Sequence, residues 1–201
     1  MSKLSSRKTF FACLTLAALS TIAFAISRTS LLTSSRRPVR VTYQVTKIEA
    51  DGTRRAIATH VRTLADGQMR RQEYHDGKLY LDQYISTDGT IYGVSHKRRE
   101  LNAANLPHKF NLNAPPQTAE TFKAQKQFHR TEQILGITAY VFRINDDDGM
   151  LIKELWFAPE TDPLPLKEIL YRDDGSQHVV EATSVKYDNV GEVRPMGYMV
   201  K

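Results

Sequence analysis

Residues 39–94 read VRVTYQVTKIEADGTRRAIATHVRTLADGQMRRQEYHDGKLYLDQYISTDGTIYGV, and most of the expected architecture follows from them. The stretch holds four of the six Asp-Gly dipeptides of the chain, beginning at Asp51, Asp66, Asp76 and Asp88, and the other two begin at Asp148 and Asp174. Asp-Gly between alternating apolar residues is a strong hairpin signal, because both residues tolerate the positive φ of tight turns. The short spacing leaves no room for helices, so the sequence predicts an antiparallel sheet of sequential strands.

The first hairpin allows a prediction of strand register. A three-residue loop over residues 50–52 sets Val41 opposite Val61. A two-residue loop would instead set Val41 opposite Arg62. Cross-strand apolar pairs stabilise a sheet by about 0.2–1 kcal/mol each. We therefore expect the three-residue loop, with Gly52 in the left-handed conformation of a bulged turn.

The fourth turn follows the same logic. A three-residue loop over residues 87–89 pairs Ile85 with Ile91 and Tyr84 with Tyr92. Both faces of this hairpin are then apolar or aromatic, which predicts a sheet region covered on both sides.

The strand over residues 68–74 is far more polar than its neighbours, so it is expected to face solvent or to lie near an edge.

Residues 96–127 interrupt the strand pattern and are expected to cover the sheet. They open with a basic run at 96–99, and residues 119–128 are predicted to form a short helix with Thr118 as its N-cap and Phe122 toward the sheet. An irregular excursion of about 30 residues in a compact domain is usually a lid, a cover or a binding loop. Further strands are predicted at 127–135, 137–144, 150–158, 166–171 and 177–187.

The predicted fold class is mainly β (α+β). We expect a single curved antiparallel sheet or an unclosed β-barrel of about nine or ten strands over residues 38–201, covered by a short helix and loop segment. Residues 190–201 are expected to be an irregular tail or an edge strand.

The N-terminal residues 1–25 have the features of a signal peptide. Basic residues precede an apolar region, and Ala23 and Ala25 fit the small-residue pattern of a cleavage site. An uncleaved anchor over residues 9–26 stays open as the alternative, since this run is at the short limit for a membrane span. The protein is thus expected to be exported, periplasmic or extracellular, or tethered to a membrane by residues 9–26.

Charge and cysteine content narrow the set of partners. The 28 basic residues of the chain include Lys3, Arg7 and Lys8 of the signal segment, so 25 remain against 22 acidic residues. Residues 26–37 are predicted to be a flexible basic tether that an anionic membrane surface could attract. A basic chain is expected to bind nucleic acid only when its charge forms a patch on the fold, and export argues further against such a partner, so nucleic acid is not expected. The only cysteine, Cys13, lies in the signal segment, so the mature chain would hold no disulfide and no thiol chemistry.

Sequence motifs give no support for enzymatic chemistry. The acidic run at 145–149 fails the calcium-loop pattern, and the histidines lack metal-site spacing. We expect no metal, no cofactor, no catalytic residue and no enzymatic activity. A hydrolase built on paired carboxylates is the minor alternative, with its candidates among isolated glutamates on strands: Glu73, Glu132, Glu154 and Glu168.

Aromatic residues give the best functional lead. Many lie on predicted strands or on the covering segment, which is typical of a packed core. They could also line an apolar groove between the sheet and residues 96–127. The candidate ligand-binding residues of that groove are Tyr80, Tyr84, Tyr92, Phe122, Phe142 and Trp156.

The C-terminal half also resembles a known family. Residues 135–137, 154–160, 163–168 and 171–175 are similar to a recurring pattern of the periplasmic lipoprotein-carrier (LolA-like) family, in which an aromatic strand ends in a Pro-containing turn before a Leu-rich strand and a hairpin. The resemblance implies an unclosed β-barrel whose helices cover an apolar cavity for acyl chains. The matching residues are structural and number five: Gly136, Trp156, Pro159, Leu166 and Gly175.

Two functions follow as hypotheses. The first is an exported, non-enzymatic β-domain that binds a lipid or lipoprotein acyl chain in an apolar groove. The second is an interaction or scaffold module of the cell envelope, with a filled core and no ligand cavity. The presence of a cavity between the sheet and residues 96–127 distinguishes them.

Overall fold

The structure is a computed structural model that describes residues 36–104, 112 and 114–201. All of them lie in one compact unit, Arg36–Lys201. The predicted signal segment with Ala23 and Ala25, and residues 26–35 of the predicted tether, lie outside the described residues. In the part that is described, no helix has the length and apolar character needed to cross a membrane.

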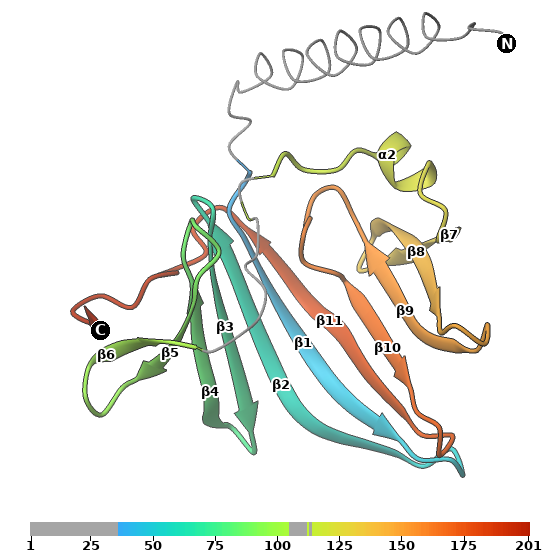
Figure 1. Ribbon diagram of the computed structural model, residues 1–201, viewed down its shortest axis with the longest axis horizontal. Coiled ribbons are helices and arrows are strands. Elements are labelled where there is room, and N and C mark those ends of the chain that lie inside the picture. The colour runs from blue at the N-terminus through green and yellow to red at the C-terminus, as the bar shows by residue number, and fades with distance from the viewer. Residues whose placement is uncertain (1–35, 105–111, 113) are drawn as a thin grey trace, which may run out of the picture. The chain divides into compact units, whose positions relative to one another are not determined.

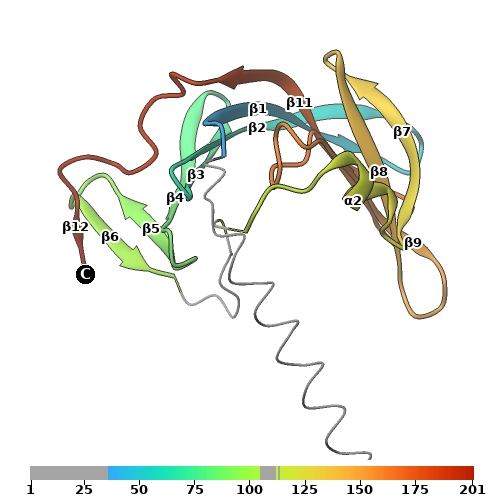
Figure 2. The same cartoon turned by 90° about the horizontal axis from the view of Figure 1, so that it is seen from above.

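A single sheet dominates this unit (Figure 1). The described residues contribute twelve strands in the order β12-β6-β5-β4-β3-β2-β1-β11-β10-β9-β8-β7. Their bounds are β1 Val39–Ile48, β2 Arg54–Ala65, β3 Gln68–His75, β4 Lys78–Ile85, β5 Ile91–Ser95, β6 Glu100–Ala103, β7 Phe128–Ile134, β8 Ile137–Asn145, β9 Leu151–Phe157, β10 Lys167–Tyr171, β11 Gln177–Tyr187 and β12 Met199–Val200. The sheet follows a curve (Figure 2), and its end strands β12 and β7 do not meet in the strand order, so the predicted curved, unclosed and mainly β fold is confirmed.

The expected number of nine or ten strands is too low. The two additional strands are short. β6 lies inside the predicted covering segment 96–127, and β12 pairs with it in parallel at the edge of the sheet, as one of the two expectations for residues 190–201 had it. The turn before β6 contains no Asp-Gly dipeptide, and Arg99 supplies its positive φ of 54°. Without a glycine as a marker, this hairpin is not visible in the sequence pattern.

The six Asp-Gly turns fall into two types. In the first type the glycine alone has a positive φ and closes a three-residue loop, as where Gly52 N donates to Glu49 O at 2.9 Å and Glu49 N donates to Thr53 O at 2.9 Å. The same pattern of hydrogen bonds recurs at Gly89, Gly149 and Gly175. In the second type, at Asp66-Gly67 and Asp76-Gly77, both residues have positive φ, as two-residue hairpin loops require.

The predicted register of the first hairpin is wrong, although its turn is predicted correctly. Val41 lies opposite Arg62, which is the pairing expected for the rejected two-residue loop. The cause is a bulge within the strands: Thr46 pairs with Ala56 but Val45 pairs with Ala58. A one-residue shift exchanges the two faces of a strand, so β2 beyond the bulge turns Arg62 to the same face as Val41.

The register of the fourth hairpin is confirmed. Ile85 pairs with Ile91 and Tyr84 with Tyr92, on opposite faces of β4 and β5. The polar strand β3, by contrast, is not near an edge, because it lies between β2 and β4. Its side chains are mostly half-buried rather than solvated.

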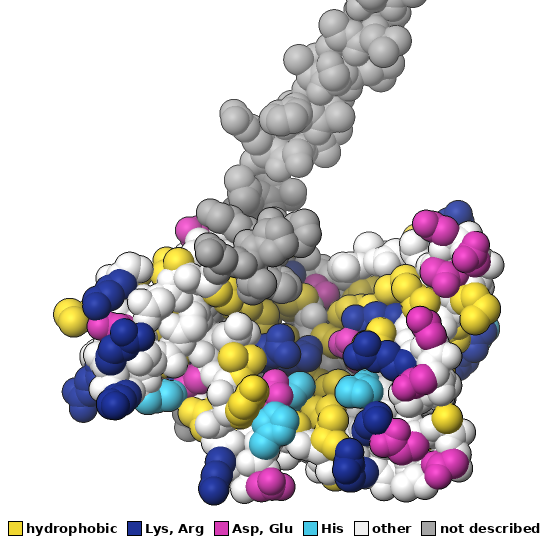
Figure 3. All heavy atoms as spheres, turned by 60° about the horizontal axis from the view of Figure 1, so that its bottom comes forward, with side chains coloured by type: hydrophobic (Ala, Val, Ile, Leu, Met, Phe, Trp, Pro, Cys, Tyr) yellow, Lys and Arg dark blue, Asp and Glu magenta, His cyan; other side chains and the backbone are white. Residues whose placement is uncertain are grey.

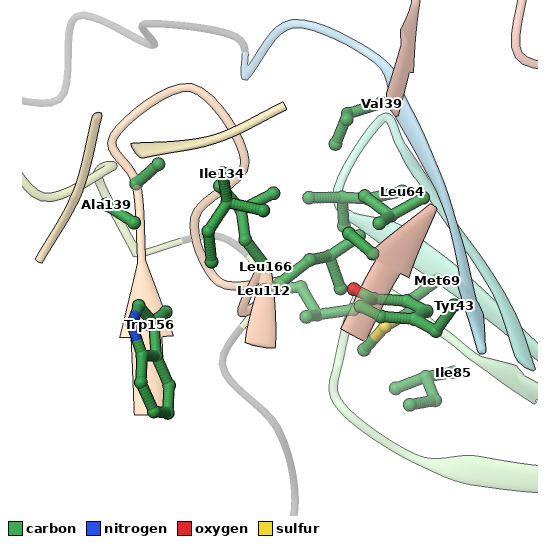
Figure 4. Close-up of a cluster of buried hydrophobic side chains, with 14 of the residues drawn as sticks. Val39, Tyr43, Leu64, Met69, Ile85, Leu112, Ile134, Ala139, Trp156 and Leu166 are labelled. Atoms are coloured by element: carbon green, nitrogen blue, oxygen red, sulfur yellow. The ribbon is translucent and has the colours of Figure 1, made fainter. Parts of the chain in front are cut away.

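The core is laid down in rows across the strands. Successive pairing connects Val39, Leu64, Met69, Ile85 and Ile91, and all five are buried. Figure 4 shows side chains of this cluster together with others from the C-terminal strands.

One short helix belongs to the described part of the covering segment. Helix α2, Ala119–Lys123, begins after Thr118, whose Oγ1 accepts a hydrogen bond from the Thr121 backbone N–H at 3.2 Å. The predicted cap and the buried position of Phe122 are confirmed. The helix is shorter than the predicted 119–128, because Phe128 is the first residue of β7.

Candidate functional site

A pocket of about 660 Å³ lies beside the end of α2, against strands β7, β8 and β9. Its volume is within the range of about 300–1,000 Å³ that is typical of small-molecule sites. The lining residues are Gln125, Lys126, Gln127, Phe128, His129, Phe142, Arg143, Ile144, Asn145, Leu155 and Phe157. We refer to it as the aromatic pocket.

Strand pairing brings the apolar side chains of the pocket together. Phe128 of β7 is paired with Phe142 of β8, and Phe142 is paired with Leu155 of β9. Paired residues lie on the same face of a sheet, so one row across three strands supplies most of the apolar surface. Phe157 joins them, with its ring centroid 6.0 Å from that of Phe142.

Phe122 of α2 packs against the same aromatic side chains. It is 1% exposed, and its ring centroid lies 5.4 Å from that of Tyr140, 5.7 Å from that of Phe142 and 6.2 Å from that of Phe157. The helix is too short to be stable by itself. Burial of Phe122 therefore holds α2 against β8, and residues 125–127, which follow the helix, line one side of the aromatic pocket.

A buried carboxylate holds the segment that leads into α2. Asp162 Oδ2 accepts a hydrogen bond from the Gln117 backbone N–H at 3.1 Å and lies 3.3 Å from Arg36 Nη2. Arg36 also donates to the backbone oxygen of Ala114. Burial raises the pKa of Asp162, against the opposing effects of Gln117 and Arg36. Arg36, the penultimate residue of the predicted tether, thus has its side chain bound within the domain.

The pocket lining combines apolar and basic groups. Lys126 and His129 stand beside the aromatic row, and the described lining residues include no aspartate or glutamate. The side chain of Arg143 is engaged elsewhere, because its Nε donates to Glu154 Oε1 at 2.9 Å. The pocket is therefore suited to an apolar chain that ends in a negative group.

Glu154 organises a polar network on the strands that form the pocket. It is 4% exposed and accepts hydrogen bonds from Arg143 and, at 2.6 Å, from the Tyr171 hydroxyl. Burial opposes ionisation of Glu154, but the hydrogen bonds from Tyr171 and Arg143 and the positive charges nearby outweigh it and lower its pKa. Burial and the bond to Glu154 raise the pKa of Tyr171 to about 12. The network joins β8, β9 and β10.

The lowered pKa of Glu154 predicts a pH-dependent contribution to stability. A carboxyl group with a depressed folded-state pKa stabilises the fold above its unfolded pKa of about 4.3, and this contribution is lost as the pH falls through the folded-state pKa. We expect Glu154→Gln to be less stable than the wild type at pH 7, with a difference that shrinks as the pH falls below about 4.3. Urea unfolding of both proteins across this pH range measures it, and a constant difference would contradict the prediction.

Only two of the six predicted groove residues contact one another near the pocket. Phe122 and Phe142 belong to one cluster, and Phe142 lines the pocket. Tyr84 and Tyr92 stack in a separate cluster, with ring centroids 6.0 Å apart.

The other two predicted groove residues lie apart from both groups. Trp156 is in the main core, and its Nε1 donates to Glu132 Oε2 at 2.7 Å. Tyr80 is 77% exposed. It lies at the bulge in the pairing of β3 with β4, and its ring centroid is 4.9 Å from that of His75.

Residues Phe128, Leu155 and Phe157 line the pocket without having been among the predicted groove residues. Each belongs to a strand that the sequence predicts correctly, within a residue or two at its ends. The pairing of β7 with β8 and of β8 with β9 brings these residues to the pocket, and the sequence pattern does not determine that pairing. The only sequence feature that indicated the contact was that Phe128 and Phe142 are both aromatic and lie on successive strands.

The glutamates considered for catalysis each have a basic side chain as a partner. Glu73 lies 3.4 Å from His60 and 2.7 Å from His75, and Glu168 lies 2.7 Å from Lys153. Glu132 accepts from Arg130 as well as Trp156. Among the described residues, no group of three or more His, Cys, Asp or Glu side chains has the arrangement of a metal site.

Comparisons with known proteins leave the chain without a family. No family model matches the sequence, and no curated protein matches it. Among solved structures, the chain is similar to a domain from Vibrio parahaemolyticus described provisionally as an outer membrane lipoprotein-sorting protein, with a TM-score of 0.21, 9% identity and coverage of 85% of this chain and 93% of that one. It is also similar to a β-barrel-like protein of a domain of unknown function (DUF1849) from Brucella abortus, with a TM-score of 0.30, 9% identity and coverage of 77% and 100%. Both TM-scores and identities are low, so neither similarity identifies a function for this chain.

Proposed function

We propose that this protein is an exported, non-enzymatic β-domain that binds the acyl chain of a lipid or lipoprotein in the aromatic pocket. The observation that carries the proposal is the composition of the lining: a row of aromatic and aliphatic side chains with basic residues beside it and no acidic residue among the described ones. Apolar walls with a few placed polar groups are typical of ligand sites. An anionic amphiphile matches both parts of the lining.

The apolar row gives the expected strength of binding. Leu155 is half-buried in the free protein, and an acyl chain would cover its remaining surface. Full burial of a leucine side chain is worth about 1.5–3 kcal/mol, so losing its contact should weaken binding by roughly tenfold. Lys126 would attract the carboxylate or phosphate end of the ligand, in a manner that added salt weakens, and His129 lines the pocket beside it.

The test is calorimetric titration with decanoate, and with decyltrimethylammonium as a ligand of the same chain length and opposite charge. We expect decanoate to bind more tightly. Leu155→Ser should weaken decanoate binding about tenfold. Ile152→Ser is the matched control, because Ile152 is an exposed residue of the same strand that does not line the pocket.

Two results would contradict the proposal. The first is the absence of decanoate binding at any concentration below micelle formation. The second is equal loss of binding in Leu155→Ser and Ile152→Ser. Mass spectrometry of lipid extracted from the protein purified from its native host would then identify the natural ligand, and a preparation free of lipid would favour the scaffold hypothesis.

The scaffold hypothesis predicts a filled core and no ligand cavity. The core around β1–β4 is filled by buried side chains, but the aromatic pocket lies outside that core and stays open. The pocket favours the lipid-binding proposal over the scaffold.

A further inference from the structure

Two arginine side chains face one another in the middle of the sheet. Arg62 of β2 and Arg71 of β3 are directly paired, and both are half-buried. Like charges opposite one another in a sheet are destabilising. None of the ion pairs formed by the described residues includes either guanidinium, and the Nε of each is buried without a hydrogen-bond partner.

The next row of the same face holds two more unpartnered polar atoms. Tyr43 of β1 is paired with His60 of β2. The Tyr43 side chain is 1% exposed. Its hydroxyl and His60 Nδ1 make no hydrogen bond of normal geometry, although Arg62 lies near enough to the Tyr43 hydroxyl to oppose the rise of its pKa. The Arg62 guanidinium carbon lies 4.9 Å from the centroid of the Tyr43 ring. Figure 4 shows this ring next to the apolar core residues.

The gathering of these atoms is unusual. Of the five unpartnered buried side-chain polar atoms in the described part of the chain, four belong to this group: Tyr43, His60, Arg62 and Arg71. Buried polar atoms in native proteins nearly always have a partner. Four orphaned atoms on two adjacent rows of one face indicate a partner that is not part of the chain.

Nearby acidic groups do not fill this role. Glu73 is bound to His60 Nε2 and His75 Nε2, at 3.4 and 2.7 Å, and Glu168 is bound to Lys153. Burial lowers the pKa of Arg71, the charge of Arg62 lowers it further, and Glu73 and Glu168 only partly oppose both effects. Figure 3 shows His side chains beside basic and acidic ones over the middle of the face seen there. Neither Glu73 nor Glu168 forms an ion pair with Arg62 or Arg71, although both carboxylates act on Arg71 over a longer distance.

We propose that Arg62, Arg71 and the Tyr43 hydroxyl form a binding site for the phosphate group of a phosphate ester. Guanidinium groups bind phosphate through two parallel hydrogen bonds each, and a phosphate has enough oxygens for both arginines and the hydroxyl together. Burial keeps Tyr43 protonated by raising its pKa, so its hydroxyl remains a donor at neutral pH. A phosphate bound there would remove the repulsion between the arginines. Because none of the three residues lines the aromatic pocket, this site can exist whether or not the pocket binds an acyl chain.

The test compares thermal unfolding in glycerol 3-phosphate with unfolding in potassium chloride of equal ionic strength. A ligand that binds only the native state raises the unfolding midpoint, so the midpoint of the wild type should rise. Arg71→Gln should lose this rise and bind glycerol 3-phosphate at least tenfold more weakly in a direct titration. Arg55→Gln is the matched control, since Arg55 is an exposed arginine of β2 and should leave the response intact.

A purely structural role for Arg71 predicts different results. If the arginines exist for binding, Arg71→Gln should be at least as stable as the wild type without phosphate, because the like-charge pair is gone. A variant less stable than the wild type in chloride would overturn the proposal. Tyr43→Phe is the second variant, which removes only the hydroxyl and should weaken phosphate binding severalfold.

A second experiment with phosphatidylglycerol vesicles distinguishes a soluble phosphate ester from a lipid headgroup as the ligand. Binding to free glycerol 3-phosphate would identify a soluble ester as sufficient. Binding only to the vesicles, lost in Arg71→Gln and kept in Arg55→Gln, would identify a lipid headgroup. If neither probe gives a response that depends on Arg71, the proposal is wrong, and this failure is separate from any result with decanoate.

Discussion

Phe122→Ala is expected to lower the free energy of unfolding by about 3–5 kcal/mol, the usual cost of removing a buried phenylalanine. Phe122 is 1% exposed and is the buried residue of α2. Its ring contacts Tyr140, Phe142 and Phe157, so the variant leaves a cavity and frees the helix together. Because Phe142 and Phe157 also line the aromatic pocket, decanoate binding should weaken in the same variant.

The measurement is urea unfolding followed by circular dichroism and by the fluorescence of Trp156, the only tryptophan of the chain. Phe122→Leu keeps most of the apolar contact and should cost clearly less than Phe122→Ala. A loss below about 1 kcal/mol, typical of an exposed position, would show that α2 does not pack as described. Equal losses in the two variants would show that the aromatic contacts are unimportant.

The hairpins of this fold could be predicted from the sequence because their turns carry local signals. Each Asp-Gly dipeptide marks a real turn, and the four three-residue loops share one set of hydrogen bonds. A turn without an Asp-Gly dipeptide was, by contrast, not predicted. The turn at Arg99 has no glycine, and the strand that follows it, β6, was missed.

The register of β1 and β2 could not be predicted in the same way, because a bulge inside a strand leaves no composition signal. The bulge between Val45 and Thr46 shifts the pairing by one residue. The shift carries Arg62 to the face of Tyr43, where an apolar pair of Val41 and Val61 was expected. An arginine on that mainly apolar face lowers the stability of the fold. Natural proteins depart from the usual pattern of apolar and polar residues mainly at functional sites.

The position of the polar strand β3 in the sheet could not be predicted from its composition either. Its composition suggested an edge or a solvated face, yet it lies between β2 and β4. A polar strand in the centre of a sheet is a conflict between local pattern and global fold. Arg70 and Glu73 are compensated by the side chains of Asp82 and His60. Arg71 has no such ion-pair partner among the described residues. The proposed phosphate site would account for this polar strand.

Two of the six predicted groove residues lie side by side, and their role in ligand binding stays a prediction. Aromatic residues were rightly placed on strands and on the covering helix, and Phe122 and Phe142 do come together. The number of aromatic residues did not indicate which of them would be in contact, because side-chain contact depends on the pairing of strands. Tyr84 and Trp156 accordingly belong to different clusters.

Asp82→Ala is expected to have an equally large effect on stability, about 3–5 kcal/mol, because it removes one partner of a buried ion pair. The Asp82 side chain is 2% exposed and that of Arg70 is 15% exposed. Arg70 Nε and Nη2 bind the two oxygens of Asp82 at 3.0 and 2.6 Å. His96 Nε2 approaches the same carboxylate at 2.7 Å, and its Nδ1 contacts the Tyr198 hydroxyl. The variant would leave the Arg70 charge buried and loosen the C-terminal tail.

The double variant Arg70→Leu/Asp82→Leu distinguishes the value of the pair from the cost of breaking it. Replacing both partners of a buried pair by apolar residues is often neutral, so the double variant should be clearly more stable than Asp82→Ala. Glu181→Ala, which breaks a more exposed pair with Lys167, serves as the control and should cost about 1 kcal/mol or less. If urea unfolding gave Asp82→Ala the same small loss as this control, Asp82 and Arg70 would be solvated, and β3 would have to lie in a more open environment.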